Sequence, residues 1–295
     1  MSMFELRVLQ YFLTVAREQN ITKAAECLHI TQPTLSRQLI QLEKELGKKL
    51  FDRGTHQIEL TKEGMLLRRR AEELLDLADK AEKEIREESE NVCGEIFIGS
   101  GEMKAFQSVA LVMKQFADKY PHVKFNLYSG NADDLKERIN KGLIDIALVT
   151  TPVEISNFEF IRMKEKDVWG IVMPTHDPLA EKDKISPQDL MGKKIIHSSR
   201  KLVREEIENW FGDAYEQVHE AASINLFHNA ICLIKNGMGY GITLENLVPK
   251  DDKSICFRPF SPQLDTGSIL IWKKHQNFSP ATAKFIEDLK HAFKV

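Results

Sequence analysis

The sequence predicts a multidomain protein of mixed α+β and α/β class, with a small helical head, one long helix and a larger two-lobed α/β domain. Three observations support this fold class. The first sixty residues hold three short helical patterns and a hairpin pattern. The segment 62–90 is proline-free and carries one narrow apolar seam. Beyond residue 91, short apolar strands alternate with helical patterns.

The head begins with an amphipathic helix over residues 4–18. Thr22 is the expected cap of a second helix, and the small pair Ala24–Ala25 suits a close crossing between two helices. A third helix follows after a short turn, with Thr31 as its cap and Gly47 just past its end. The head therefore pairs two helices across a tight turn.

A short β-hairpin and a long helix come next. Residues 50–53 and 57–60 flank the turn 54–56, which indicates a hairpin, and Thr61 is the expected cap of the long helix. Its seam steps alternately by four and three residues, as in a coiled coil, so we expect a dimer helix rather than one lying on a globular core. The seam residues are Leu67, Ala71, Leu74, Ala78, Ala81 and Ile85.

The remaining two hundred residues predict mostly parallel sheets covered by helices. The expected strands are 95–99, 123–128, 144–149, 168–173, 194–197, 218–221 and 268–272. One expected helix follows the strand 95–99 and ends at residue 120, and the others cover 133–141, 204–210, 226–236 and 280–293. They form two halves, roughly 93–165 and 166–265, and the tail returns to the first half. Such an arrangement leaves a cleft between the halves.

Composition and charge limit the class of protein. With 42% hydrophobic and 29% charged residues, the chain is neither disordered nor collagen-like. Residues 1–62 hold nine Lys or Arg and seven Asp or Glu, a net charge of +2. Because the whole chain has a net charge of −3, the remaining residues have a net charge of −5. We find no membrane-length apolar run and no secretion signal, so we expect a cytoplasmic protein without a membrane partner.

Four cysteines stand far apart and lack the C-x-x-C spacing of zinc sites. We interpret them as buried thiols rather than as a disulfide framework, and we predict no metal and no cofactor. They are Cys27, Cys93, Cys232 and Cys256.

The head carries residues with many fixed spacings, found in the runs 21–39, 42–43, 46–47, 50–53 and 60–64. The first of these runs reads ITKAAECLHITQPTLSRQL. These runs strongly resemble the head of LysR-type transcriptional regulators, and the long helix and two-halved remainder are similar to that family too. The resemblance implies a winged helix-turn-helix, a linker helix that forms dimers, and an effector domain of periplasmic-binding-protein type.

We therefore expect a DNA-binding domain at 1–61, a linker and dimerisation helix at 62–90, and an effector-binding domain at 91–295. In that last domain, lobe 1 would comprise about 91–165 and 266–295, and lobe 2 about 166–265. The partners that the resemblance implies are double-stranded DNA, a small polar or carboxylated effector, further copies in a homodimer and homotetramer, and RNA polymerase.

The resemblance places the start of the third helix in the DNA major groove, where amide and guanidinium groups can read base edges. Pro33 offers an apolar contact to a thymine methyl, the two caps offer backbone N–H groups to phosphates, and the hairpin reaches the backbone or minor groove. A merely solvated face is the alternative, and Lys48 and Lys49 fit that description. The candidates are Thr22, Thr31, Gln32, Pro33, Ser36, Arg37 and Arg53.

Small polar residues follow several predicted strands, at the edge where open α/β sheets bind ligands. Each could equally be an ordinary helix cap. Together with positions matching the family's effector cleft, the candidates are Ser100, Gly101, Glu102, Met103, Asn131, Thr150, Ser198, Arg200, Asn225 and Thr243. Arg200 could fork onto a carboxylate. Glu102 could repel an anion, pair with Arg200, or select a ligand that carries an amine.

The effector region lacks the sequence signatures of catalysis. It has no H-E-x-x-H, no G-x-S-x-G and no Walker loop, and the glycines of 237–241 are wrongly spaced for a dinucleotide site. We predict no catalytic residues and no enzyme. The alternative is a periplasmic-type solute-binding protein or an enzyme fused to a helix-turn-helix, which would show a metal requirement or turnover.

Overall fold

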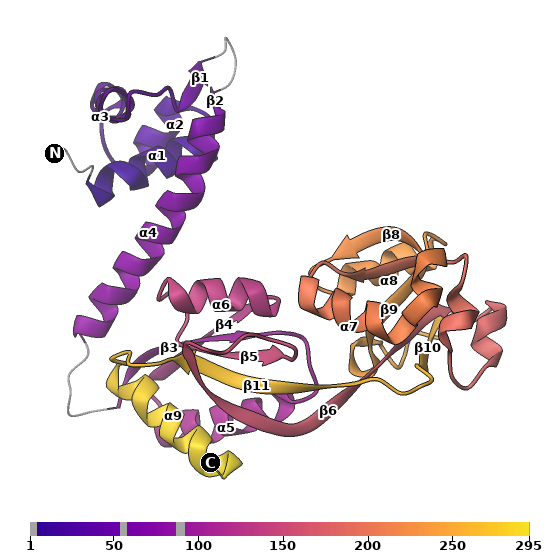
Figure 1. Cartoon of the computed structure of the whole chain (residues 1–295). Coiled ribbons are helices and arrows are strands. Elements are labelled where there is room, and N and C mark those ends of the chain that lie inside the picture. The colour runs from indigo at the N-terminus through magenta and orange to yellow at the C-terminus, as the bar shows by residue number, and fades with distance from the viewer. Residues whose placement is uncertain (1–4, 54–57, 87–91, 295) are drawn as a thin grey trace. The chain divides into compact units, whose positions relative to one another are not determined.

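The computed structural model describes residues 5–53, 58–86 and 92–294, apart from the side chains of residues 53 and 83–86. The chain divides into two compact units, Met1–Arg86 and Glu87–Val295, and each is described here by itself (Figure 1).

In its described residues, the first unit consists of four helices and a hairpin. Its elements are α1 (Leu6–Glu18), α2 (Ile21–Cys27), α3 (Gln32–Leu46), β1 (Phe51–Arg53), β2 (Ile58–Leu60) and α4 (Lys62–Arg86). Strands β1 and β2 are antiparallel, as the hairpin pattern predicted. The core contains Leu9 and Phe12 of α1, Ala24–Ala25 of α2, and Leu35 and Leu39 of α3. The small alanines are buried at the crossing, which lets the helices approach closely.

One predicted helix cap of this unit, Thr22, is wrong, whereas Thr31 is the N-cap residue of α3 as predicted. Helix α2 begins two residues earlier than expected, and its cap is Asn20, whose side chain accepts a hydrogen bond from the Lys23 N–H, so Thr22 lies inside the helix. Thr31 occupies the cap position of α3, but its hydroxyl bonds the Thr34 hydroxyl at 2.8 Å instead of a backbone N–H. Gly47 ends α3 with φ of 63°, which confirms the expected left-handed C-cap.

Part of the apolar seam predicted on helix α4 packs inside the same chain and is not available to a second copy. Ala71 is fully buried in the core of the first unit, and Leu67 packs against that core. Leu74 is 41% exposed, and Ile85 lies outside the described side chains. The first half of α4 therefore docks on α1, because the heptad pattern cannot tell a neighbouring helix of the same chain from one of another copy.

The second unit has two lobes that share one continuous sheet, and helices cover both faces of the sheet in each lobe (Figure 1). Lobe 1 contains β3 (Gly94–Ser100), α5 (Phe106–Lys119), β4 (Val123–Ser129), α6 (Ala132–Asn140), β5 (Ile146–Thr150) and α9 (Pro280–Phe293). Lobe 2 contains β7 (Lys194–Ser198), α7 (Lys201–Phe211), β8 (His219–Ile224), α8 (His228–Lys235), β9 (Tyr240–Leu244) and β10 (Ile255–Pro259). Short 3-10 turns at Pro178–Glu181, Pro187–Leu190, Gly212–Gln217 and Glu245–Leu247 complete lobe 2.

Two long strands, β6 (Phe158–Pro174) and β11 (Asp265–Lys273), join the lobes. The sheet order is β4-β3-β5-β11-β6-β9-β7-β8, and β10 also pairs with β6. The predicted strand at 168–173 is only the second half of β6, since the charged stretch before it hid the strand's first half. Pairing within each lobe is parallel, but β6 and β11 run antiparallel to their neighbours, so the sheet is mixed rather than mostly parallel.

The four cysteines are free thiols, but the expectation that they are buried is wrong. Cys27 and Cys232 are exposed, while Cys93 and Cys256 are half-buried. In α8 the buried face consists of Ala230, Ile231 and Ile234, so Cys232 points outward by helical spacing.

Candidate functional site

A cleft of about 620 Å³, its open mouth included, lies between the two lobes of the second unit. It is lined by nine of the ten predicted effector residues. These are Gly101, Glu102, Met103, Asn131, Thr150, Ser198, Arg200, Asn225 and Thr243. They come from the carboxyl ends of strands and from the loops that follow, where open α/β sheets place their ligand sites.

Ser100 is the exception among the predicted residues. It is the last residue of β3 and is buried, and its hydroxyl donates to the Gly101 carbonyl oxygen at 2.8 Å. Because the side chains of a strand alternate between the two faces of the sheet, a residue at the right strand end can still point away from the cleft.

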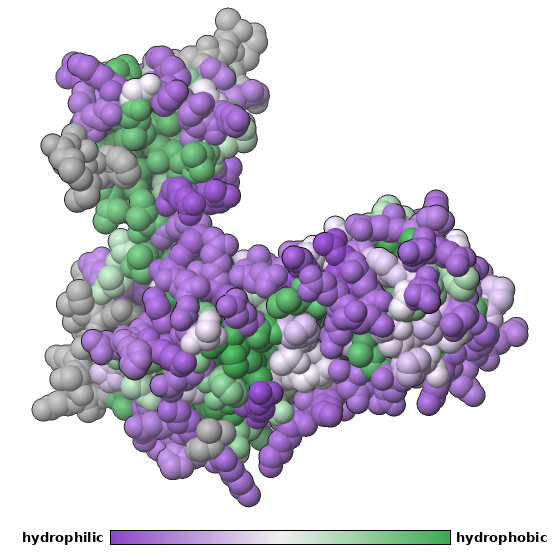
Figure 2. Space-filling model, in the orientation of Figure 1, coloured by the Kyte–Doolittle hydropathy of each residue, from purple (hydrophilic) through white to green (hydrophobic). Residues whose placement is uncertain are grey.

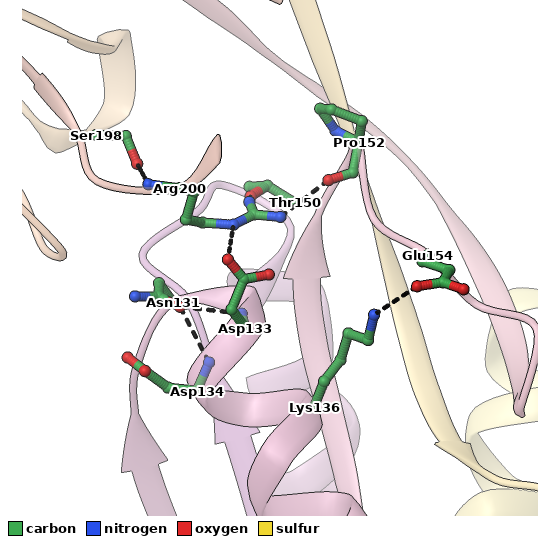
Figure 3. A network of polar contacts seen from close by, with 9 residues as sticks. All are labelled: Asn131, Asp133, Asp134, Lys136, Thr150, Pro152, Glu154, Ser198 and Arg200. Carbon is green, nitrogen blue, oxygen red and sulfur yellow. Dashed lines mark hydrogen bonds and ion pairs between the residues drawn. The ribbon is translucent and has the colours of Figure 1, made fainter. Parts of the chain in front are cut away.

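Arg200 of lobe 2 crosses the cleft and bonds lobe 1 (Figure 3). Its Nη1 donates to Thr150 Oγ1 at 3.0 Å, and its Nη2 donates to the Pro152 carbonyl oxygen at 2.8 Å. Its Nε lies 3.7 Å from Asp133 Oδ2, at the start of α6, and has no hydrogen bond partner among the described residues. Only 5% of Arg200 is exposed. The guanidinium is thus a buried cation that links both lobes.

Burial and neighbouring charges act in opposite directions on the pKa of Arg200. Burial lowers the pKa of Arg200, and the carboxylates of Asp133 and Glu206 act in the opposite direction. Burial likewise raises the pKa of Glu206, against the influence of Arg200. A guanidinium stays charged in proteins, so the cleft contains a fixed positive charge.

Asn131 in the cleft lining also caps a helix, and Ser198 orders the turn before α7. The Asn131 side chain accepts from the N–H groups of Asp133 and Asp134 at the start of α6. The Ser198 hydroxyl accepts from the Arg200 N–H at 3.3 Å. These bonds fix the orientation of groups that border the cleft.

Glu102 does not pair with Arg200, which was one of its three expected roles. Its Oε2 accepts a hydrogen bond from the Phe227 N–H, 3.3 Å away, immediately before α8 of lobe 2. A carboxylate at that place is favoured by the helix dipole. Arg200 and Glu102 therefore make two separate polar bridges between the lobes, one from each side.

The apolar wall of the cleft was not predicted from the sequence. This wall comes mainly from lobe 2 and consists of Trp169, Val203, Ile224, Leu226, Phe227, Ile242, Leu244 and Leu247. In a sequence, such residues look like ordinary core positions of β6, α7 and β9. Only the packing of two lobes reveals which of them face a cleft.

The predicted DNA-contacting residues gather at the start of α3, except for Thr22 in α2 and Arg53 in β1. Thr22, Thr31, Gln32, Pro33 and Arg37 are exposed, and Ser36 is half-buried. The Arg53 side chain lies outside the described part of the chain. The opposite side of α3 is buried through Leu35, Leu39 and Leu42, so the polar side faces outward, as predicted.

A buried carboxylate ties α3 to the hairpin. Glu43 Oε1 accepts from the N–H groups of Leu50 and Phe51, at 2.8 and 3.3 Å. Lys49 lies 3.7 Å from the same side chain. The sequence reasoning missed this residue, since a charged position near a helix end normally indicates solvent exposure.

Within residues 5–53, 58–86 and 92–294, no group of three or more His, Cys, Asp or Glu side chains is placed to hold a metal ion. Over the same ranges, every helix is too short or too polar to cross a bilayer.

Comparison with known families matches both units. Residues 6–65 match the family described as bacterial regulatory helix-turn-helix protein, lysR family. Residues 89–294 match the family described as LysR substrate binding domain.

Among similar proteins, the transcriptional regulator BsdA of Bacillus subtilis is 39% identical over 165 residues. That match covers 55% of this chain and only 56% of BsdA. The Hca operon transcriptional activator HcaR of Escherichia coli is 28% identical over 298 residues, 96% of each chain.

Similar solved structures extend over both units. The crystal structure of CbnR, a LysR family transcriptional regulator, has a TM-score of 0.76 at 21% identity and covers 99% of this chain and 100% of that one. Full-length CbnR in complex with its target DNA has a TM-score of 0.72, at 98% and 99% coverage. At this identity the likeness establishes the fold.

Proposed function

Because the chain belongs to the LysR family of bacterial transcriptional regulators, we propose that it binds operator DNA through α3 and the hairpin, in the cytoplasm, under the control of an effector held in the cleft. The observation that carries this proposal is the buried Arg200, which spans the cleft and contacts both lobes. A ligand there would change the contacts between lobes, which is what an effector must do. We propose a regulatory role without catalysis.

For the DNA interface, we expect Arg37→Ala to weaken specific DNA binding by about 1 to 3 kcal/mol and to relax base preference. Arg37 is exposed on the polar side of α3, so its loss should leave the fold intact. Electrophoretic mobility shifts with an operator fragment and with random DNA measure both effects.

Lys48→Ala is the matched control for that experiment. Lys48 is an exposed cation just beyond α3, and a contact with phosphate would weaken binding to all sequences alike. Equal losses on operator and random DNA for Arg37→Ala would contradict base reading by Arg37.

For self-association, we propose that the exposed apolar residues of α4 pair two copies, and that dimers join into tetramers. Figure 2 shows hydrophobic surface over the region of α1 and α4 in the first unit. The exposed large apolar residues of α4 are Met65, Leu66, Leu74 and Leu77. By helical spacing, Leu66, Leu74 and Leu77 lie on one side of the helix, and exposed apolar residues gathered in this way are unusual on a monomer.

We expect Leu74→Asp to weaken the dimer and shorten the two-half-site footprint on DNA, because a charge would be buried in the interface. Light scattering and footprinting measure these effects. Arg69→Asp introduces the same residue elsewhere on α4 and should leave the assembly intact. An unchanged mass for both variants would exclude Leu74 from the interface.

For the effector, the cleft favours a small carboxylate that carries an apolar body. Arg200 supplies a positive charge and two N–H donors for the carboxylate. Trp169 and Phe227 belong to the apolar wall that would contact the body of the ligand. Binding would bias the angle between the lobes and so the spacing of the paired DNA-binding heads, and RNA polymerase would respond to that change. Glu102 still leaves room for a ligand that also bears an amine.

A thermal-shift screen of small metabolites, followed by footprinting on DNA upstream of the protein's own gene, tests this proposal. We expect a carboxylate to raise the melting temperature and to alter the footprint. DNA must change effector affinity reciprocally. A ligand that stabilises the protein without changing any footprint would overturn effector control.

A further inference from the structure

Among the described residues, the lining of the cleft holds one acidic and one basic side chain. Glu102 comes from lobe 1 and Arg200 from lobe 2, and the other lining residues are uncharged. The two do not pair with each other, because each is tied to the opposite lobe by its own hydrogen bonds. The opposite charges of the cleft therefore lie in two separate places.

The two charges differ in how they are neutralised. Arg200 has the Asp133 carboxylate 3.7 Å from its Nε (Figure 3). Glu102 is half-buried and forms no ion pair within the part of the chain that the structure describes. Its contact is a neutral donor, the Phe227 N–H at 3.3 Å. Charges withdrawn from water are normally paired, because their lost hydration has to be compensated, so the partner that Glu102 lacks is a cation.

Two oxygen atoms near Phe227 are accessible from the cleft. Glu102 Oε2 accepts the Phe227 N–H, which leaves Oε1 accessible and without a hydrogen bond to the described residues. The Thr243 hydroxyl is likewise accessible and unbonded within those residues, although Thr243 is only 3% exposed. Thr243 lies on the same face of β9 as Gly241, where an added Cβ would be 3.1 Å from the Phe227 ring. Both oxygens can accept from a donor held beside that ring.

The Arg200 end of the cleft offers donors instead. The Thr150 hydroxyl accepts from Arg200 Nη1, and the Ser198 hydroxyl accepts from the Arg200 N–H. Each hydroxyl still has its own proton to donate, since neither donates to another described residue. Together with the guanidinium, these donors suit a carboxylate. The two ends of the cleft thus favour groups of opposite charge.

We propose that the effector is a zwitterion whose ammonium group binds Glu102 and whose carboxylate faces Arg200, with an apolar body between the two. An ammonium has three donors and no acceptor, so Glu102 Oε1 and the Thr243 hydroxyl can both accept from it. The apolar wall, which includes Trp169, contacts the body of the ligand. This inference rests on the proposed function of the cleft and adds Glu102 as the residue that selects for an amine.

Isothermal calorimetry on the full chain tests the proposal with 4-(aminomethyl)benzoate as the probe and 4-methylbenzoate as its counterpart without the amine. The two share a ring and a carboxylate, so the ratio of their affinities isolates the amine. We expect the amine to increase affinity about tenfold, because hydrogen bonds between charged groups are the strong ones. Glu102→Gln keeps an oxygen for the Phe227 N–H and removes the charge, so it should make the two affinities equal.

Asp133→Asn is the matched control, because it removes a carboxylate beside Arg200 and leaves Glu102 in place. It should raise the affinity for both probes and leave their ratio unchanged. Thr243→Val is a second variant in case Glu102→Gln does not fold. It removes one acceptor at nearly the same volume and should lower the ratio about threefold.

Equal affinity of the two probes for the wild type would overturn amine recognition in the cleft. A ratio that falls in Asp133→Asn and persists in Glu102→Gln would overturn the role of Glu102. Binding of 4-methylbenzoate and its effect on the DNA footprint do not depend on the amine, so failure of the proposed function would be seen separately. Absence of binding by both probes would overturn the carboxylate end of the site, and the zwitterion with it.

Discussion

Gly64→Ala is expected to lower the free energy of unfolding of the first unit by about 3 kcal/mol. A Cβ at position 64 would lie 2.1 Å from the Leu50 carbonyl oxygen and 2.9 Å from Leu60 Cδ2. The carbonyl cannot move freely, since it accepts the Thr61 N–H at 3.0 Å. Elsewhere in a helix the same change would stabilise by about 0.5 to 1 kcal/mol.

Urea denaturation, read by hydrogen exchange at the amides of α1 and α3, measures the effect within the full chain. Arg69→Ala, at an exposed position of the same helix, is the matched control and should change stability by less than about 0.5 kcal/mol. If both variants unfold at the same urea concentration, α4 does not depend on close contact at Gly64.

Arg200→Ala is expected to reduce the affinity of the cleft for benzoate, a carboxylate on an apolar ring, by about 100-fold. It removes a buried cation whose charge-assisted bonds are each worth about 1.5 to 3 kcal/mol. Thr150→Val keeps the shape and removes only a hydroxyl that accepts from Arg200, so a loss of about fivefold is expected. Isothermal calorimetry on the full chain measures both.

Lys201→Ala is the control, because Lys201 is the next residue in sequence and an exposed cation outside the cleft lining. Unchanged affinity in Arg200→Ala and Thr150→Val alike would remove the cleft as the benzoate site. A loss in Thr150→Val alone would keep the site but exclude the role of Arg200 with the carboxylate.

Much of the fold could be predicted from local signals. Apolar spacing located α1 and α3, and Gly47 ended α3 as expected. Long-range packing decided the rest. The alternation that defines strand β6 is interrupted by charges at 164–167, and strands β9 and β10 were not predicted, because glycines and short lengths obscure them.

The candidate cleft was predictable where backbone rules apply and not where packing decides. Residues after strand ends, such as Asn131 and Thr150, were placed by sheet topology. The apolar wall around Trp169 was not, since burial in a core and burial beside a cleft leave the same sequence pattern. The bridge from Glu102 to the Phe227 N–H joins residues 125 positions apart, beyond any local signal.

The lobes are connected by a pair of hydrogen-bonded strands rather than by flexible linkers. Strands β6 and β11 stay hydrogen-bonded from Phe158↔Lys273 to Val168↔Asp265, and their register shifts between Gly267 and Ile269. A paired ribbon resists stretching but tolerates twisting and bending at such an irregularity. Relative motion of the lobes should therefore be mainly a small torsion centred on Gly267. Because the lobes rotate about this point, a small change in angle at the cleft becomes a larger displacement at the far end of each lobe.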